Sequence, residues 1–276
     1  MNSGKTVYLV GAFTNPDWRE EFIRRFPKIK WIDPKDNPQS SMAKAVFTDL
    51  ESSIKSNFTL CYIPSGKKSA GTTSYIELGV ARTKGKAIIA VDESGTGEKE
   101  KILYGISSYY FSGKEDSFNA LEKEILFSKY EKVNCENSPT EKDSYENVYF
   151  AGDIEDLTPH MVRLKNKGKK INCGLDVKNL DEFKETDLMI TNFKKRGNYG
   201  RKDALFFMGV SYALDIPIIL VDENPVNYPT LPAVARRTFH KENRFDELSY
   251  YLDRLESLKI NEEALVYYNL MNNFNK

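Results

Sequence analysis

The sequence is poor in the side chains that metal centres, disulfide frameworks and histidine-based catalysis require. Its 276 residues include three cysteines and two histidines. Cys61, Cys135 and Cys173 are odd in number and far apart, which excludes a disulfide framework and a four-cysteine zinc site and indicates a reducing compartment. His160 and His240 alone are too few for a His-rich metal centre and leave almost no material for a Ser-His-Asp triad. We therefore expect neither a metal site nor a cofactor.

The sequence also lacks an excess of charge and a long apolar run. Forty basic and forty acidic residues cancel, and the pI is about 6.8, so no overall field attracts nucleic acid or a membrane surface. No apolar run approaches the roughly 20 residues of a spanning helix, and the first residues, Met-Asn-Ser-Gly-Lys, have no signal-peptide character. We expect a cytoplasmic protein that binds neither nucleic acid nor membrane.

Short apolar runs alternate with helical patterns along the first half of the chain. We predict strands at 7–10, 31–32, 59–63, 87–91 and 109–111. Helices are expected after residue 15, over 42–55, around Glu77 and over 116–130. Strands that alternate with helices indicate a parallel sheet covered on both faces.

The same order of segments starts again in the second half. Residues 148–152 match residues 7–11 at an offset of 141, and residues 218–223 match 88–93 at an offset of 130. Between the copies, residues 133–146 are polar and contain a proline, as is typical of a linker. We therefore predict an α/β protein with two tandem parallel-sheet domains, at 1–132 and 147–276.

The segment 71–81 lies between two predicted strands and carries Glu77. Ligands of open parallel sheets bind beyond the carboxyl ends of the strands, where this segment begins. The spacing Ser74-x-x-Glu77 also fits a capping box, with Ser74 as the N-cap. Both interpretations place an ionised carboxylate near a helix N-terminus. The second copy keeps the glycine of the segment but has Phe207 in place of Glu77.

Other polar segments leave several interpretations open. Asp49 and Glu51 fit an exposed helix face, but two carboxylates from separate elements also suit glycoside cleavage. The loop 66–73 has Thr72 where a Walker A loop requires lysine, which argues against an NTPase, although its N–H groups could still hold a phosphate. Gly11 stands alone and gives no dinucleotide-binding glycine series.

Taken in order, these motifs resemble the nucleoside 2-deoxyribosyltransferase superfamily, above all its deoxyribosyltransferase-like branch. The resemblance covers roughly residues 6–93. It rests on Val-Tyr-Leu-Val-Gly at 7–11, Asn-Pro-Asp-Trp-Arg at 15–19, Asp-Pro at 33–34, Asp-Leu-Glu at 49–51 and Ser-x-x-Glu-Leu-Gly at 74–79. It implies that both domains are flavodoxin-like and that the second is a degenerate copy.

The resemblance further implies cleavage of a base–sugar bond in a nucleoside or nucleotide. Glu77 would attack the anomeric carbon and Asp49 would manage the proton of the base or the sugar hydroxyls. The other residues that we expect to bind substrate are Tyr8, Gly11, Phe13, Trp18, Asp33, Gly71, Thr73 and Ser74. Among these, Tyr8 and Trp18 are either stacking surfaces or core residues, and Gly11 would let the backbone approach the ligand.

The sequence departs from the superfamily pattern at three positions. Gly71 stands where many transferases have a second acid, which leaves transfer and hydrolysis both open. Asn179 and Phe207 replace the two proposed catalytic acids in the second copy. We expect that copy to be a non-catalytic partner in an intramolecular pseudo-dimer, within a chain that can form a further homo-oligomer. The alternatives are a catalytically inactive nucleotide-binding sensor and an NAD glycohydrolase.

Overall fold

We analysed a computed structural model of the chain. The structure describes residues 5–12, 17–36, 41–67, 70–94, 101–122, 145–194, 201–222, 230–240 and 242–254. The chain divides into two compact units, one formed by Met1–Ser40 with Lys44–Glu136 and one by Ser41–Ala43 with Asn137–Lys276. Each unit is described by itself.

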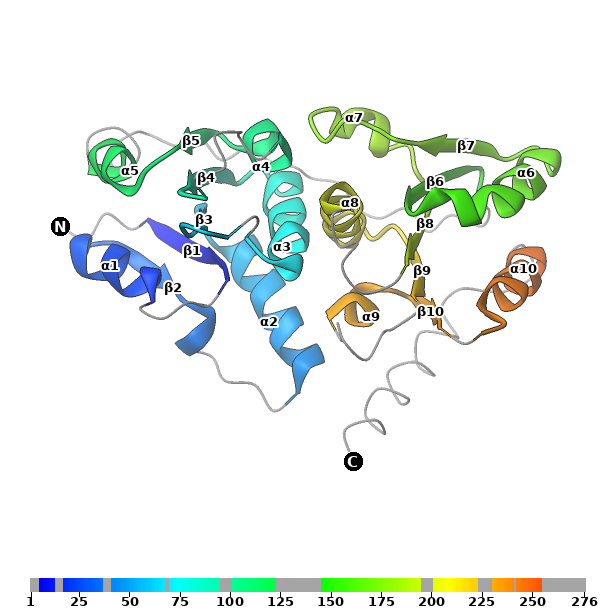
Figure 1. The fold of residues 1–276 in the computed structure, drawn as a ribbon, viewed down its shortest axis with the longest axis horizontal. Coiled ribbons are helices and arrows are strands. Elements are labelled where there is room, and N and C mark those ends of the chain that lie inside the picture. Colours follow the sequence, from blue (N-terminus) through cyan, green and yellow to red (C-terminus); the bar gives the residue numbers. More distant parts are fainter. Residues whose placement is uncertain are drawn as a thin grey trace. The chain divides into compact units, whose positions relative to one another are not determined.

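The first unit contains a sheet of five parallel strands (Figure 1). The strands are β1 Thr6–Gly11, β2 Lys30–Ile32, β3 Phe58–Ile63, β4 Ala87–Asp92 and β5 Tyr109–Phe111. Their order in the sheet is β2-β1-β3-β4-β5, which is the flavodoxin-like order. The order reverses between β1 and β3, so ligands of this fold bind at the carboxyl ends of those two strands.

Helices cover both faces of this sheet, as the near-continuous apolar strands require. The helices are α1 Trp18–Arg25, α2 Met42–Lys55, α3 Thr72–Thr83, α4 Lys101–Ile106 and α5 Lys114–Ala120, with a 3-10 turn η1 at Pro34–Asp36. Helices α1 and α5 share one face, where Phe22 and Phe118 pack against alternate residues of the strands. Helices α2, α3 and α4 lie on the opposite face (Figure 1).

The second unit repeats this architecture. Its strands are β6 Asn147–Gly152, β7 Lys170–Cys173, β8 Leu188–Phe193, β9 Ile218–Asp222 and β10 Arg237–Phe239, and they are all parallel in the order β10-β9-β8-β6-β7. Its helices are η3 Ile154–Leu157, α6 Thr158–Asn166, α7 Leu180–Phe183, α8 Lys202–Ala213, α9 Thr230–Val234 and α10 Arg244–Arg254. The prediction of two tandem flavodoxin-like α/β domains is confirmed.

The structure refines several expected element boundaries. Helix α1 begins at Trp18 because the Asp17 side chain caps it by accepting the backbone N–H of Arg19. The expected closing helix is α5, which starts at Lys114, and its expected continuation over 123–130 lies outside the described residues. Tyr145, which the linker prediction includes, is buried in the second core. No helix within the described ranges is long and apolar enough to cross a membrane.

Candidate active site

Glu77 and Asp49 come from neighbouring helices on the same face of the first sheet. Helix α2 supplies Asp49 and helix α3 supplies Glu77, and the Ser53 hydroxyl of α2 donates to the Glu77 backbone carbonyl at 3.2 Å. Both carboxyls interact with the hydroxyl of Tyr8 on β1. Three elements separated in the sequence therefore bring two acids to one tyrosine.

The capping-box interpretation of Glu77 is wrong. Helix α3 begins at Thr72 with Gly71 as its N-cap, so Ser74 lies inside the first turn and Glu77 in the second. The Ser74 hydroxyl donates to the carbonyl of Ala70 at 3.0 Å and does not cap the helix. Since macrodipole effects fall off within the first turn, the helix N-terminus gives the Glu77 carboxylate little support. Another interaction must compensate for its burial.

Burial controls the ionisation of both acids. Glu77 is only 6% exposed, and this burial, helped by the nearby Asp49 charge, raises its pKa to about 8. Burial also raises the pKa of the half-buried Asp49, to about 6. Near neutral pH the pair therefore holds about one proton, mostly on Glu77. This overturns the expectation that the site favours an ionised Glu77.

The hydroxyl of Tyr8 lies within this pair of acids. Tyr8 is fully buried, and burial together with the Glu77 and Asp49 charges raises its pKa. Its contacts with the carboxyls favour their ionised forms, but within the described residues the hydroxyl makes no hydrogen bond of full geometry. A buried hydroxyl without a well-formed hydrogen bond is rare in a purely structural setting.

Arg19 is a fourth member of the cluster, and the sequence analysis gave it no role. It is 1% exposed, and its guanidinium donates to the Gly11 carbonyl at 2.5 Å. Its charge favours ionisation of both Asp49 and Glu77. The position after Asp17-Trp18 hinted at a buried arginine, because an N-cap aspartate and a tryptophan ring hold such a side chain from both sides.

Two predicted ligand contacts have structural roles. Trp18 packs against Phe22 and Tyr62, and its indole N–H donates to the Ala12 carbonyl at 3.1 Å. It is therefore a core residue and not a stacking surface. Gly11 has φ +146°, and a Cβ there would lie 2.6 Å from the Tyr62 carbonyl oxygen. The close approach of the adjacent strand therefore requires a glycine here, while its expected role in ligand approach stays a prediction.

The remaining predicted site residues are less directly connected to the acids. Asp33 is buried at the end of β2 and pairs with Arg19 Nε at 3.5 Å. Thr73 is half-buried in the first turn of α3. Gly71 has φ +114°, so the helix start requires its flexibility. Phe13 lies outside the described residues.

In the second unit, aromatic side chains pack around the tyrosine that matches Tyr8. Tyr149 has the position of Tyr8 in the matched strand, and its ring packs on Phe183 and Phe207 with centroids 4.9 and 5.1 Å away. Phe183 and Phe207 stack at 4.7 Å. Asn179, matched to Asp49, is exposed and precedes the four-residue helix α7. The second unit therefore has neither acid at this place.

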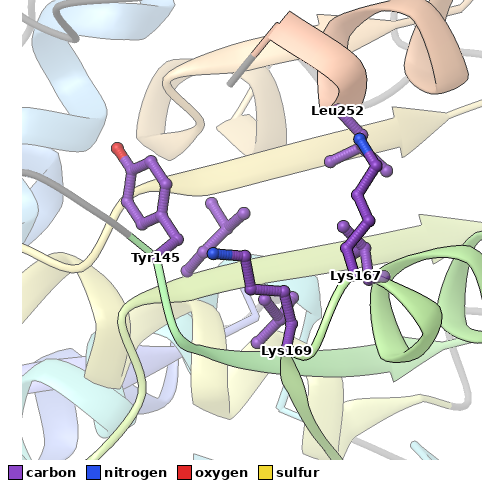
Figure 2. Close-up of a pocket in the computed structure, with 7 residues that line it drawn as sticks. Tyr145, Lys167, Lys169 and Leu252 are labelled. Atoms are coloured by element: carbon purple, nitrogen blue, oxygen red, sulfur yellow. The ribbon is translucent and has the colours of Figure 1, made fainter. Parts of the chain in front are cut away.

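A small depression in the second unit offers no competing site (Figure 2). It has about the space of one water molecule and lies near the amino ends of the strands. Tyr145, Val148, Leu164, Lys167, Lys169, Leu188 and Leu252 line it. Lys167 and Lys169 already pair with Asp253 and Glu146. Across the part of the chain that the structure describes, no group of acids, histidines and cysteines could hold a metal ion.

Comparisons with known proteins add no family. No family model and no curated protein matches the chain. Among solved structures, it is similar to a probable two-component system response regulator/GGDEF domain protein, with 10% identity and a TM-score of 0.29 over 91% of this chain and 99% of the other. A putative protein of the same description has 11% identity with the same coverage and TM-score. Similarity this low supports no conclusion about fold or function.

Proposed function

We propose that the first unit cleaves the base–sugar bond of a nucleoside or nucleotide, with Glu77 as nucleophile and Asp49 as proton carrier. One observation supports this above all. The buried Glu77 of α3 and the half-buried Asp49 of α2 both raise the pKa of Tyr8 on β1, in a sheet of flavodoxin-like order. Two acids with different proton affinities are what a glycosidic cleavage uses as its nucleophile and its acid.

The proposed reaction has two steps. A Glu77 carboxylate oxygen attacks the anomeric carbon, the C–N bond breaks, its electron pair goes to the base nitrogen, and Asp49 protonates that nitrogen directly or through water. Water or another base nucleophile then attacks the same carbon, Asp49 takes up the proton, and the ester bond to Glu77 breaks. The covalent intermediate divides one difficult substitution into two easier ones.

In the free site the proton lies mainly on Glu77, whereas the reaction requires it on Asp49. The attack requires an ionised Glu77. Burial, however, raises the pKa of Glu77 above that of Asp49, so Glu77 holds a proton more firmly than Asp49 does. A sugar that gains positive charge as the C–N bond breaks would stabilise the Glu77 anion, so the active protonation state forms more readily in the transition state than in the free enzyme. The Tyr8 hydroxyl lies where it can stabilise either anion.

Access to Glu77 is narrow. The side chain is 6% exposed, so a substrate must enter past the half-buried Asp49 or displace neighbouring groups. Residues 13–16, 37–40 and 68–69 connect β1, β2 and β3 to their following helices and lie outside the described residues.

The experiment is release of free base from a panel of nucleosides, nucleotides and NAD, followed by chromatography. Glu77→Gln should lower the rate at least about a thousandfold, because an amide cannot form the glycosyl ester. Glu51→Gln is the matched control, since Glu51 is an exposed acid two residues from Asp49 that pairs with Lys55. Release at the full wild-type rate by Glu77→Gln would exclude the mechanism.

A binding module is the second candidate function. The buried and largely protonated state of Glu77 favours it, because a neutral acid can donate a hydrogen bond to a ligand without reacting. If the first unit is a binding module, calorimetry should show saturable nucleotide binding that is weaker in Glu77→Ala, and the same panel should give no base release. Turnover by the wild type with loss in Glu77→Gln would decide for the enzyme.

A further inference from the structure

A polar cluster lies at the carboxyl ends of β6 and β8 in the second unit, and the proposed reaction does not use it. The strand order of this sheet reverses between β6 and β8, which is where ligands of such sheets bind. Asn192 near the end of β8 lies opposite Gly152, the last residue of β6. The cluster consists of Asn192, Asp153, Asp156, Lys194 and Arg201.

The side chain of Asn192 is buried, and only one end of its amide is satisfied. It is 1% exposed. Its Nδ2 donates to the Asp153 carbonyl at 2.9 Å and to Asp156 Oδ2 at 3.5 Å. These two acceptors fix the orientation of the amide, because the opposite orientation would bring Oδ1 against them. Within the described residues, Oδ1 has no hydrogen-bond partner. It is therefore an acceptor for a donor that those residues do not supply.

The first unit shows that the fold does not require an asparagine at this place. Tyr62 has the matched position, since it lies opposite Gly11 as Asn192 lies opposite Gly152. Tyr62 belongs to the apolar core of its sheet. A structural role for Asn192 explains the Nδ2 bonds, which hold the turn after β6. It does not explain a buried acceptor without a donor, which is costly in a purely structural setting.

The other members of the cluster place a partly exposed cation next to Asn192. Asp153 Oδ2 accepts from the backbone N–H of Lys194 at 2.9 Å, and Asp153 Oδ1 lies 3.4 Å from Arg201 Nε. Lys194 Nζ pairs with Asp156 Oδ1 at 2.8 Å. The Arg201 side chain is 46% exposed, and this contact with Asp153 does not use its terminal guanidinium nitrogens. The cluster thus combines a buried acceptor with a half-exposed donor.

We propose that this cluster binds two adjacent hydroxyls of a sugar, as in the ribose of a nucleoside: one hydroxyl donates to Asn192 Oδ1, and its neighbour accepts from the Arg201 guanidinium. A hydroxyl can both donate and accept, as this pair of partners requires. An ionised carboxylate only accepts and would leave Oδ1 unpaired. An ammonium group would be repelled by the cations Lys194 and Arg201.

The position of the cluster agrees with this ligand. In dinucleotide-binding sheets, a side-chain oxygen beyond the carboxyl ends of the strands accepts from a ribose hydroxyl. The long contact between Arg201 and Asp153 is the outermost one of the cluster, so the guanidinium can turn to the ligand at little cost. The inference does not depend on the proposed function, because every residue that it uses belongs to the second unit.

The experiment is a titration of the full chain followed by hydrogen exchange and mass spectrometry. The probes are adenosine and uridine, their 2′-deoxy and 3′-deoxy forms, ribose and inorganic phosphate. The chain carries Glu77→Gln, so that the proposed reaction does not consume the probe. A ribonucleoside should protect peptides that cover 147–157 and 188–194. At least one of its deoxy forms should bind there about tenfold more weakly, since it leaves an acceptor unpaired.

Asn192→Leu separates ligand binding from a structural role. It removes the acceptor, so the ribonucleoside and its deoxy form should then bind equally weakly. A structural role would weaken both alike and leave their ratio unchanged. Arg201→Gln should weaken the ribonucleoside about fivefold. Lys184→Gln is the matched control, because Lys184 is a cation of the same unit that is 43% exposed and pairs with Asp181. If Asn192→Leu does not fold, the comparison of Arg201→Gln with Lys184→Gln decides.

Three results would overturn the inference: no protection of these peptides by any sugar probe, an unchanged ratio in Asn192→Leu, or protection by inorganic phosphate alone. Protection by ribose as strong as by the nucleosides supports it and identifies the free sugar as the ligand. The outcome is separable from that of the proposed function. The titration needs no turnover, and failure of base release by the wild-type chain leaves its result unaffected.

Discussion

Tyr8 and Tyr149 have the same position in two sheets of the same strand order, yet different side chains surround them. The charges of Glu77 and Asp49 raise the pKa of Tyr8. Tyr149 contacts the rings of Phe183 and Phe207. Helices α3 and α8 are both twelve residues long and start and end at matched positions. The element that carries Glu77 in one unit and Phe207 in the other is therefore unchanged.

This comparison separates what the fold needs from what the first unit adds. The second unit shows that a phenylalanine satisfies the interior of this architecture. A buried pair of acids with raised pKa values stabilises the folded state less than apolar packing does. The first unit keeps the acids in spite of that cost, which is the pattern expected where stability is given up for chemistry.

Exchanging the residues at the matched positions 77 and 207 should lower stability most in the second unit. Phe207→Glu removes a stacked ring and places a carboxyl among the rings of Tyr149, Phe183 and Phe206. We expect it to lower the free energy of unfolding by about 4 kcal/mol or more, since loss of a core phenylalanine alone costs about 3–5 kcal/mol. Urea unfolding of the full chain, followed by circular dichroism, measures this.

Phe207→Leu is the control for volume and should cost about 1.5 kcal/mol or less, because it keeps the site apolar. The reverse exchange, Glu77→Phe, abolishes base release if Glu77 is the nucleophile. A Phe207→Glu variant as stable as Phe207→Leu would show that the second unit still accommodates an acid, and the contrast between the two units would fail.

The pH dependence of stability should differ between the units. Burial raises the pKa of Glu77 from 4.5 to about 8, so the folded first unit binds more protons than the unfolded chain between these values. Its free energy of unfolding should fall as pH rises through this window and level off above pH 8. The expected loss is a few kcal/mol, and Asp49 adds to it below about pH 6.

Glu77→Gln should flatten this dependence between pH 6 and 8, where Asp49 is already ionised. Tryptophan fluorescence during urea unfolding at pH 5, 6, 7 and 8.5 follows the first unit alone, because Trp18 and Trp31 lie there. Glu51→Gln should leave the slope unchanged, since its carboxyl is exposed. A wild-type slope that is already flat between pH 6 and 8 would contradict the buried, protonated state of Glu77.

Sequence reasoning reached the fold because parallel sheets have a strong local pattern. Buried apolar runs predicted β1, β3 and β4, and the internal repeat predicted β6 and β9 of the second sheet with nearly the same boundaries. Helix starts were less predictable, because they depend on single residues. Gly71 is the N-cap of α3 and has a positive φ. The capping-box pattern of Ser74 and Glu77 contains no information about that backbone conformation.

The site was only partly predictable from the sequence, because some of its residues depend on how separate elements are arranged in space. The pairing of Asp49 with Glu77 followed from the resemblance, and the structure brings both to Tyr8. The role of Arg19 did not follow, since it depends on the chain direction at the end of β1 and on α1 lying across the opposite face. The sequence left Trp18 open between a stacking surface and a core residue, because an aromatic residue near a strand end has the same sequence pattern in both cases, and the structure shows it in the core.

Placing an acid at position 179, which matches Asp49, should have the smallest effect. Asn179 is exposed at the N-cap of α7, where its side-chain amide contacts Glu182. Aspartate caps a helix as well as asparagine does, and its repulsion from Glu182 is screened by solvent. Asn179→Asp should therefore change the free energy of unfolding by less than about 0.5 kcal/mol.

The reverse substitution at the matched position of the first unit, Asp49→Asn, provides the contrast. It removes a charge that raises the pKa of Glu77, so the fall in stability with pH should move to lower pH. Urea unfolding at several pH values measures both variants. If Asn179→Asp cost more than about 1 kcal/mol, or if Asp49→Asn left the pH dependence in place, positions 49 and 179 would not differ as the structure indicates.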